Sequence, residues 1–507
     1  MSNEIFIASK EQARQIDYEA IHSIKIPSLV LMEHAAIKLL HSIPDTSYQK
    51  IVIVCGPGNN GADGMALARL LALKEQPVSC IHPSMDRFSN EEKIQFEAIQ
   101  KLDIPCFLNT DPAAFVELEQ ADMIVDALFG SGLSRPIEGI FATWIEAINS
   151  LDALVLAIDI PSGLNADTGE ILGVCVHADL TIAIDSIKWG ELLREGKNVC
   201  GTLKSVDIGI PSFLHRDCAS LLNLEYVRSI FPRRDPFSYK NKNGKVLMIG
   251  GSDEMPGAIS MAADACFHSG VGLLSVFVPK SIQMLLETKM SYVMSLGVPE
   301  ENGRFSQDAL SILKEQLDRY DAFSIGNGMH KYAVTEQMVK LLLASNKPVL
   351  VDADGLVYIK KEIDLSQRKA DTILTPHLKE MADLLDIDVK EIERDRIKIV
   401  KRFCKENPSV VLVLKSSITL IGFQDRLFVL DHPTSALAKG GSGDTLTGMI
   451  LGLYAWCHDA YLAALCGVYA HSLAASLSSV DPISFTPNDL VENLSQAFLT
   501  LQSKKTP

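Results

Sequence analysis

The sequence lacks an excess of positive charge. Its 507 residues include 47 Lys and Arg against 63 Asp and Glu, so the formal net charge is -16 at pH 7. Proteins that bind nucleic acid draw much of their affinity from Lys and Arg at the phosphates, and this chain would need a local basic patch to do so. We therefore predict no nucleic-acid partner.

Closely spaced cysteines are missing as well. The ten cysteines are scattered singly, without a Cys-x-x-Cys spacing. Structural zinc sites and the disulfide frameworks of small secreted domains depend on such spacings. We predict reduced thiols in a cytoplasmic protein.

A third absence is that of long apolar runs. The longest candidate, 449–457, is far shorter than the roughly 18 residues that span a bilayer. The first residues, MSNEIFIASKEQARQ, lack the basic and then apolar order of a secretory signal. We predict no membrane partner. Because 47% of the residues are apolar and 22% are charged, we expect a folded globular protein.

What the sequence does contain is a regular alternation. Apolar, β-branched runs alternate with segments of helical period along the whole chain, which is typical of α/β proteins with parallel strands. The length predicts two to four domains. The candidate strands are 51–55, 123–126, 154–158 and 180–184 in the first half, and 246–249, 274–278, 322–325, 349–352, 372–374 and 410–414 in the second.

The two halves differ in charge. A polar, proline-containing stretch at 210–245 predicts a crossover between two α/β domains, with the boundary near residue 220. Residues 1–220 hold 16 Lys and Arg and 30 Asp and Glu, a net charge of -14, and the remainder carries -2. The first domain is therefore expected to carry nearly all of the acidity.

Three loops in the first half have the composition of a ligand site. The loop 55–64, CGPGNNGADG, lies between a strand and a helical pattern, where glycines allow close approach and the free N–H groups of a helix start attract an anion. Asp126 and Asp159 each end a further strand and open the loops 126–136 and 159–163. A tight turn or a helix cap would explain any one of them alone. Ligands of open parallel sheets bind beyond the carboxyl ends of the strands, so three such loops favour a binding site.

These loops resemble the N-terminal domain of the bifunctional NAD(P)H-hydrate repair enzymes, over about residues 10–210. The resemblance implies a Rossmann-like three-layer α/β sandwich that interconverts the R and S hydrates of NADH and NADPH, with a potassium ion near the ligand. Asp159 would be the acidic residue at the reacting ring, and Asn60, Asp126 and Ser162 would bind the cation through oxygen atoms. The implied substrate-binding residues are Asn59, Asn60, Gly61, Ala62, Asp63, Gly130, Ser131, Gly132, Leu133, Ser134, Arg135, Pro136 and Asp159.

Two positions depart from this family. Ala62 stands where the family usually has glycine, which is a small change unless the position needs a positive φ. Trp189 replaces a proline, next to Lys188. Lys188 either assists Asp159 in proton transfer or pairs with a carboxylate.

In the second half, 440–444 reads GGSGD before a helical, apolar run. The free N–H groups of a helix start can stabilise a transferring phosphoryl group, and Asp444 can take the proton of an acceptor hydroxyl. A glycine-rich cap with Asp in the first turn is also ordinary helix chemistry. The motif becomes specific only together with the segments around it.

An ordered set of segments over about 225–500 resembles the ribokinase-like dehydratase that forms the C-terminal domain of the same enzymes. The segments are 244–252, 255–258, 269–272, 352–354, 375–377 with 380–382, 414–415 and 440–444. The resemblance implies that a nucleotide phosphate activates the ring hydroxyl of the S hydrate, that water is lost as phosphate, and that NADH or NADPH is regenerated. Bacterial-type members use ADP, with which we expect Mg²⁺, and release AMP.

The same resemblance implies the residues of this second site. Asp444 would act as general base and would contact the hydrate. The other implied contacts are Ala258, Gly328 and His377 to the hydrate, and Lys415, Ser416, Ser417, Ile418, Thr419 and Gly443 to the nucleotide.

Several positions depart from this pattern too. The segment 324–329, SIGNGM, replaces a Gly-Pro-Gly-Leu-Gly pattern, and Leu378 and Lys379 replace Pro-Gly. Ser416 replaces a glycine and adds a side chain where a phosphate or ribose would approach. His377 has a second interpretation, as a histidine that only starts a helix. Because Gly443 and Asp444 are intact, we expect activity to persist.

Two other functions fit parts of the sequence. One is a small-alcohol kinase, related to hydroxymethylpyrimidine or thiazole kinases, with the first half as a regulatory domain. The other is a first half that only binds, as in RNA-associated scaffold proteins. A scaffold would not need Asp63, Asp126, Asp159 and Ser162, which are all present. We favour the repair enzyme and expect a homo-oligomer.

Overall fold

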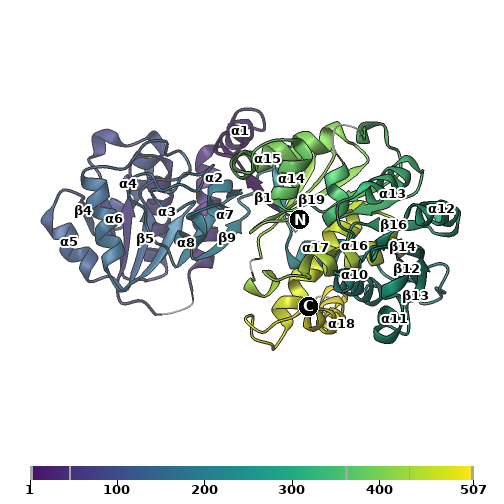
Figure 1. Cartoon of the computed structure of the whole chain (residues 1–507). Helices are drawn as coiled ribbons and strands as arrows, with labels where there is room; N and C mark the ends of the chain where they lie inside the picture. The colour runs from purple at the N-terminus through teal and green to yellow at the C-terminus, as the bar shows by residue number, and fades with distance from the viewer. Residues whose placement is uncertain (1–3, 45–46, 360–362, 433, 504–507) are drawn as a thin grey trace. The chain divides into compact units, whose positions relative to one another are not determined.

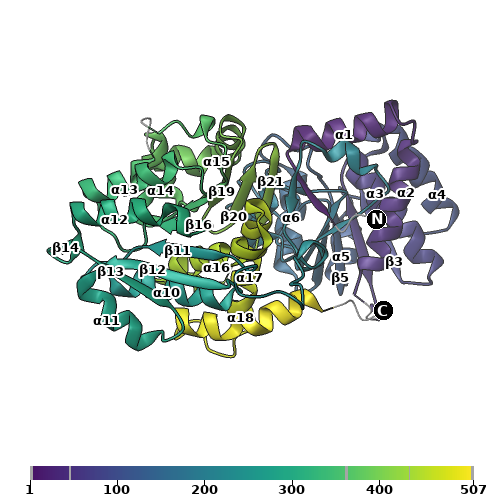
Figure 2. The same cartoon turned by 90° about the vertical axis from the view of Figure 1, so that its right-hand side faces the viewer.

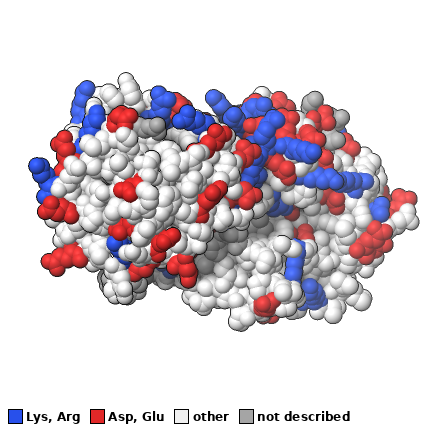
Figure 3. Space-filling view, turned by 90° about the vertical axis from the view of Figure 1, so that its left-hand side faces the viewer, with Lys and Arg blue, Asp and Glu red and all other residues white. Residues whose placement is uncertain are grey.

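The computed structural model describes residues 4–44, 47–359, 363–432 and 434–503. The chain divides into two compact units, Met1–Ser220 and Leu221–Pro507. In each unit parallel strands alternate with helices along the chain (Figure 1). On the described part of the face drawn in Figure 3, Lys and Arg side chains lie close to Asp and Glu side chains, without a broad field of basic residues alone.

The first unit is built around a parallel sheet. Its central strands consist of apolar residues without interruption, such as IVIVC at Ile51–Cys55, because both faces of the sheet are covered. The neighbouring strands named here pair in parallel throughout. Their order across the sheet is β4 (Cys106–Leu108), β3 (Val78–His82), β2 (Ile51–Cys55), β5 (Met123–Ala127), β6 (Leu154–Ile158), β7 (Leu180–Ile184) and β9 (Thr202–Val206).

Helices cover both faces of this sheet. Successive side chains of a strand point to opposite faces of the sheet and enter two separate cores. In β2, Ile51 and Ile53 lie in one core, and Val52 and Val54 lie in the other. The predicted three-layer α/β arrangement is therefore confirmed. The helices are α2 (Ser28–Ser42), α3 (Asn59–Leu73) and α4 (Asn90–Lys101) on one face, and α5 (Pro112–Glu119) and α6 (Ile140–Ser150) on the other.

The start of the chain pairs with a late segment of the same unit. Strand β1 (Ile5–Ala8) lies parallel to β8 (Ile187–Lys188), and α1 (Lys10–His22) follows with a capping box of Ser9 and Gln12. This pairing holds α1 next to the loop that carries Lys188. The remaining short elements of the unit are η1 (Met85–Arg87), α7 (Trp189–Leu192), α8 (Gly196–Val199), η2 (Ser212–His215) and β10 (Ala219–Leu221).

The second unit has a larger, mixed sheet. Its strands pair in parallel from β13 to β19, and a final antiparallel hairpin extends the sheet through β20 and β21. Their order is β13 (Met294–Val298), β12 (Leu273–Pro279), β11 (Lys245–Ile249), β16 (Ala322–Ile325), β17 (Val349–Val351), β18 (Thr372–Leu374), β19 (Val410–Leu414), β20 (Thr419–Phe423) and β21 (Arg426–Leu430).

One face of this sheet is covered by helices that share a single large core (Figure 2). They include α9 (Leu224–Ile230), α10 (Pro256–His268), α16 (Ser442–Cys457), α17 (Ala460–Leu477) and α18 (Pro487–Gln502). Helices α10 and α16 pack so closely that only glycine fits at position 448. A Cβ there would lie 1.9 Å from the carbonyl oxygen of Ala262. The other elements are α11 (Lys280–Lys289), β14 (Glu300–Glu301), β15 (Arg304–Phe305), α12 (Gln307–Gln316), η3 (Leu317–Arg319), α13 (Ala333–Ala344), η4 (Ala353–Tyr358), η5 (Leu365–Gln367), α14 (Leu378–Leu385), α15 (Val389–Glu406) and η6 (Ser435–Leu437).

Two predictions need correction. Helix α17 is 18 residues long and apolar enough to cross a membrane by length and composition, so the statement that no segment approaches that length is wrong. The helix is 72% buried, because its small residues pack in the core of the second unit. The stretch 210–245 is also more than a polar crossover, since Leu222, Val227 and Phe231 belong to that core.

Candidate functional sites

The three loops predicted in the first unit converge on one cavity of about 720 Å³. The cavity lies at the carboxyl ends of β2, β5 and β6, where the sheet leaves room between strand ends and helix starts. The predicted residues that line it are Asn59, Asn60, Asp63, Gly130, Ser131, Gly132, Leu133, Ser134, Arg135 and Asp159.

Three of the residues predicted to bind the substrate lie outside the cavity lining, as do Asp126 and Ser162 of the predicted cation site. Gly61 and Ala62 are buried in the first turn of α3, where a Cβ at Gly61 would lie 2.0 Å from the carbonyl oxygen of Gly56. Ala62 is not among the residues of positive φ, which explains why an alanine is tolerated there. Pro136 is exposed beyond the end of the lining loop.

Asp159 and Lys188 form an ion pair on the wall of this cavity. Asp159 has a positive φ of 67° and accepts a hydrogen bond of 3.0 Å from the backbone N–H of Ser131. Burial raises the pKa of Asp159, but Lys188 and the Ser131 contact outweigh it and hold the pKa below its ordinary value. Lys188 is held by the carbonyl oxygens of Ser186 and Ile184 at 2.8 and 3.1 Å. Of the two roles open to Lys188, pairing with a carboxylate is the one that these contacts show.

The cavity also holds acidic residues that were not predicted. Asp17, from α1, and Asp185, after β7, line its wall together with Asp63. Burial raises the pKa of Asp17 to about 6, with Asp185 adding to the effect, and burial raises the pKa of Asp63 as well. Asp185 accepts a 2.7 Å hydrogen bond from His215. No glycine loop or strand end marks Asp17, which is why sequence analysis missed it.

The residues proposed for a cation offer oxygen ligands. Ser162 donates from Oγ to Asp126 at 2.7 Å and from its backbone N–H at 2.8 Å. Both polar atoms of the Asn60 side chain are buried without a hydrogen-bond partner among the described residues. The same part of the chain contains no cluster of three His, Cys, Asp or Glu side chains suited to a metal ion. Asn60, Asp126 and Ser162 together offer an amide, a carboxylate and a hydroxyl, which are oxygen ligands of the kind that a hard cation takes.

A second cavity, of about 670 Å³, lies in the second unit. It is bounded by the turn that follows β19 and by the start of α16. Ile418 is buried behind this turn with 1% exposure, so it supports the wall without lining the cavity. The predicted residues that do line it are His377, Lys415, Ser416, Ser417, Thr419 and Gly443.

The glycine-rich loop brings backbone and charge together at the edge of this cavity. Gly441 has a φ of 91° and precedes the first residue of α16, which leaves the free N–H groups of the helix start at the loop. A Cβ at Gly443 would lie 3.3 Å from the Nζ atom of Lys415. A phosphate bound here would meet N–H groups and an ammonium from two sides.

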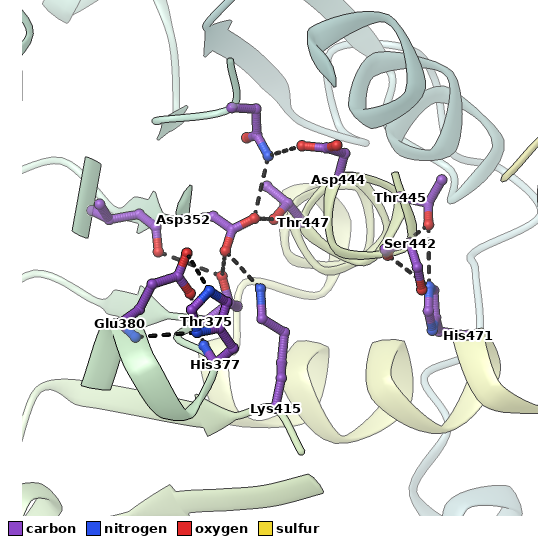
Figure 4. A network of polar contacts seen from close by, with 12 residues as sticks. Asp352, Thr375, His377, Glu380, Lys415, Ser442, Asp444, Thr445, Thr447 and His471 are labelled. Atoms are coloured by element: carbon purple, nitrogen blue, oxygen red, sulfur yellow. Dashed lines mark hydrogen bonds and ion pairs between the residues drawn. The ribbon is translucent and has the colours of Figure 1, made fainter. Parts of the chain in front are cut away.

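Asp444 belongs to a polar network around the buried Asp352 (Figure 4). The amide of Asn327 donates to Asp444 at 2.7 Å and to Asp352 at 3.2 Å. Lys415 donates to Asp352 at 2.9 Å. Burial raises the pKa of Asp444 to about 6, although the Asn327 hydrogen bond acts in the opposite direction. The carboxylate is therefore ionised at neutral pH and close to the pH range in which it can be protonated.

The residues predicted to contact the hydrate lie around this aspartate. Gly328 adjoins Asn327 and has a φ of 68°, and a Cβ on it would lie 3.0 Å from the Cβ of Ala258. His377 caps α14, where its Nδ1 accepts from the backbone N–H of Glu380 at 3.1 Å. Because His377 also lines the cavity, its capping role and its predicted binding role are compatible.

Comparison with known proteins places both units in one family. The model of the NAD(P)H-hydrate dehydratase family matches residues 246–496, and that of the YjeF-related protein N-terminus matches 28–190. The bifunctional NAD(P)H-hydrate repair enzyme Nnr of Moorella thermoacetica is 34% identical over 487 residues, covering 93% of this chain and 92% of the relative. The enzyme of the same name from Thermofilum pendens is 32% identical, with the same coverage. This chain belongs to the bifunctional NAD(P)H-hydrate repair enzymes.

A solved structure resembles the second unit. The ADP/ATP-dependent NAD(P)H-hydrate dehydratase of Bacillus subtilis, co-crystallised with ATP and Mg²⁺, is 29% identical, with a TM-score of 0.50, and covers 55% of this chain and 98% of its own. The second unit therefore has the ribokinase-like fold of the repair-enzyme dehydratases. The kinase with a regulatory first half is the weaker interpretation, because the matching family models are those of the repair enzyme.

In this repair enzyme, sequence analysis also missed the residues that support Asp444. Thr375 and Thr447 each donate a 2.8 Å hydrogen bond to Asp352, and Asn327 appeared only as a departure from a family pattern. His471 lies within hydrogen-bonding distance of the carbonyl oxygen of Ser442, at 3.0 Å (Figure 4). Burial lowers the pKa of His471 to about 4, so it is a neutral support of the glycine-rich loop.

Proposed function

We propose that this repair enzyme carries one reaction on each unit, epimerisation of the R and S hydrates on residues 1–220 and dehydration of the S hydrate on residues 221–507. The observation that carries the proposal is the contrast between two aspartates, Asp159 on the wall of the first cavity and Asp444 next to Gly443, which lines the second. Asp159 is paired with a buried ammonium, and Asp444 is hydrogen-bonded to a neutral amide beside a phosphate-binding loop. The mixture of R and S hydrates would thus meet one site for epimerisation and another for dehydration.

In the dehydratase reaction, ADP would occupy the cavity lined by 415–419 and Gly443. Its terminal phosphoryl group transfers to the ring hydroxyl of the S hydrate, while Asp444 takes the hydroxyl proton. The C–O bond then breaks and phosphate leaves, and loss of a proton from the adjacent ring carbon restores the double bond. The products are NADH or NADPH, AMP and phosphate. The N–H groups at the start of α16 and Lys415 offset the charge on the phosphoryl group.

Two cations would assist these sites. A potassium ion bound by Asn60, Asp126 and Ser162 would supply positive charge in a strongly acidic unit, next to a ligand that carries phosphates. We propose that Mg²⁺ arrives with the nucleotide phosphates, as is usual for this ion. The unpartnered Asn60 amide supports the potassium site.

The cellular setting belongs to the same proposal. The ten cysteines form no disulfide in the part of the chain that the structure describes, which supports a reducing, cytoplasmic setting. The homo-oligomer and the absence of nucleic-acid and membrane partners stay predictions, and sedimentation of the purified chain tests the first of them.

The test is recovery of the absorbance of reduced nicotinamide from a mixed pool of R and S hydrates in potassium buffer, with ADP, ATP or no nucleotide. We expect complete recovery that depends on nucleotide. Recovery that stops at the S fraction would remove the epimerase half of the proposal, and no recovery with either nucleotide would remove the dehydratase half. Repeating the assay with sodium in place of potassium tests the cation.

A further inference from the structure

Helix α1 contributes to the first cavity a carboxyl group that the sequence analysis did not predict. Asp17 lines the cavity that also contains Asp159 and Lys188. Its neighbours Ile16 and Ala20 are buried in a small apolar core, so the helix is anchored while the Asp17 side chain stays accessible from the cavity. Among the described residues, Asp17 has neither a hydrogen-bond partner nor an ion-pair partner. The contacts of the Asp17 carboxyl group therefore show no role in stabilising the fold.

The charged groups around Asp17 set it apart from Asp159. Although Asp17 is exposed to the solvent of the open cavity, desolvation by the surrounding protein and the charge of Asp185 raise its pKa to about 6, with a smaller upward effect from Asp159. Lys188 and His215 act in the opposite direction. Asp63 also lines the cavity and interacts with Asp17, and its own pKa is raised. One cavity thus holds a carboxylate that is kept charged and a carboxyl that is readily protonated, a division that often marks a base and an acid.

Epimerisation requires such a pair. Hydration of the reduced ring leaves a hydroxyl on the carbon next to the ring nitrogen. An acid gives a proton to this hydroxyl, the C–O bond breaks with its electron pair, water leaves, and the nitrogen lone pair forms a C=N bond. Water then adds to the opposite face and gives its proton to a base. Because water that adds to a cation becomes strongly acidic, a weak base such as a paired carboxylate is sufficient.

We propose that Asp17 is a catalytic residue of the epimerase site, which gives the proton to the hydroxyl in one direction of the reaction while Asp159 takes the proton of the incoming water. In the reverse direction the two residues exchange roles. After each turnover, proton exchange with the solvent returns both carboxyl groups to their starting protonation states. This inference rests on the proposed epimerisation in the first unit.

The test starts from the pure R hydrate without nucleotide, and follows formation of the S hydrate by chromatographic separation. We expect Asp17→Asn to lower kcat at least 100-fold, because an amide cannot transfer the proton. The control is Glu19→Gln, which removes the same charge from the same helix outside the cavity lining and should stay within threefold of the parent chain. Dehydration of the S hydrate with ADP should be unchanged in both variants.

The pH profile separates catalysis from a structural role. A proton donor must be protonated, so kcat of the parent chain should fall as pH rises through the pKa of Asp17, near 6. The residual activity of Asp17→Asn should lack this decline, and Asp17→Glu should recover at least a tenth of the parent rate. If the parent chain does not epimerise the hydrate, the proposed function fails. If the parent chain does, the assignment of Asp17 alone is overturned by an active Asp17→Asn, by an unchanged pH decline in its residual activity, or by an inactive Asp17→Glu.

Discussion

The two cavities use a lysine and an aspartate in opposite ways. In the first unit Lys188 contacts Asp159 itself, and the pKa of Asp159 is held low. In the second unit Lys415 contacts Asp352, and the aspartate at the glycine-rich loop is left with an amide partner. Asp444 therefore keeps a pKa of about 6. The difference shows that an aspartate at a strand end or a helix start marks a candidate site, whereas the charge of its partner sets what the aspartate does there.

The largest effect is expected from Asp444→Asn. This change keeps the size of the side chain but removes the group that takes the hydroxyl proton, so dehydration should fall by about 10²- to 10⁴-fold. Epimerisation should be unaffected, because Asp444 lies in the other unit. The two rates are measured on separate samples of pure S and pure R hydrate. Loss of both activities in a folded variant would contradict the assignment of one reaction to each unit.

Lys188→Met removes the charge that distinguishes the first site from the second. The buried Asp159 would lose its compensating ammonium, which is expected to cost about 3–5 kcal/mol of folding free energy and to raise the pKa of Asp159. Epimerisation should fall by about 100-fold, and the residual rate should require a higher pH. Chemical denaturation and the R-to-S assay measure the two effects. Lys101→Met, an exposed lysine of the same unit, is the control and should change neither.

The sequence predicted the parts of these sites that are local. The strands 51–55, 154–158 and 410–414 were predicted with their observed bounds, because continuous apolar runs are specific to strands buried on both faces. The three loops at the first cavity were found because three strand ends of one sheet carry them, and ligands of parallel sheets bind beyond the carboxyl ends of the strands. Each of these signals lies within a few residues of chain.

The missing parts depend on distant contacts. Asp17 is one of three acidic residues on α1 and nothing in the local sequence distinguishes it, because its place at the cavity follows from the pairing of β1 with β8. Asn327 lies 117 residues from Asp444 and is joined to it by the fold alone. Helix α17 was missed because its alanines and serines weaken the apolar signal although they pack well in a core. The periodicity of apolar residues predicts which positions are buried. It does not predict which polar side chains come into contact in the fold.

A smaller effect is expected from Asn327→Ala. The Asn327 hydrogen bond lowers the pKa of Asp444, so removing it should raise that pKa further. Asp444 acts as a carboxylate, so dehydration by the parent chain should decline as pH falls through about 6. In the variant this decline should begin at a higher pH. A rise of one pKa unit would cost about twofold at neutral pH and nearly 10-fold at about pH 5, because below both pKa values one unit corresponds to a factor of ten in the ionised fraction. A pH profile with an unchanged acid limb would show that Asn327 does not tune Asp444; Asn493→Ala, on α18, is the control.

The smallest effect tests whether the phosphate loop differs from an ordinary helix cap. A Cβ at Gly443 would lie 3.3 Å from the Nζ atom of Lys415, while a Cβ at Gly440 would meet no atom within 4 Å. Gly443→Ala should therefore displace Lys415 slightly and raise the KM for ADP by about threefold, with a smaller change in kcat, because the lost contact is made to the bound nucleotide before the chemical step. Gly440→Ala should leave both constants unchanged. If the two alanines change KM equally, the loop acts only through its backbone flexibility, as a helix cap does. In that case Lys415 does not contact the phosphate through the space beside Gly443.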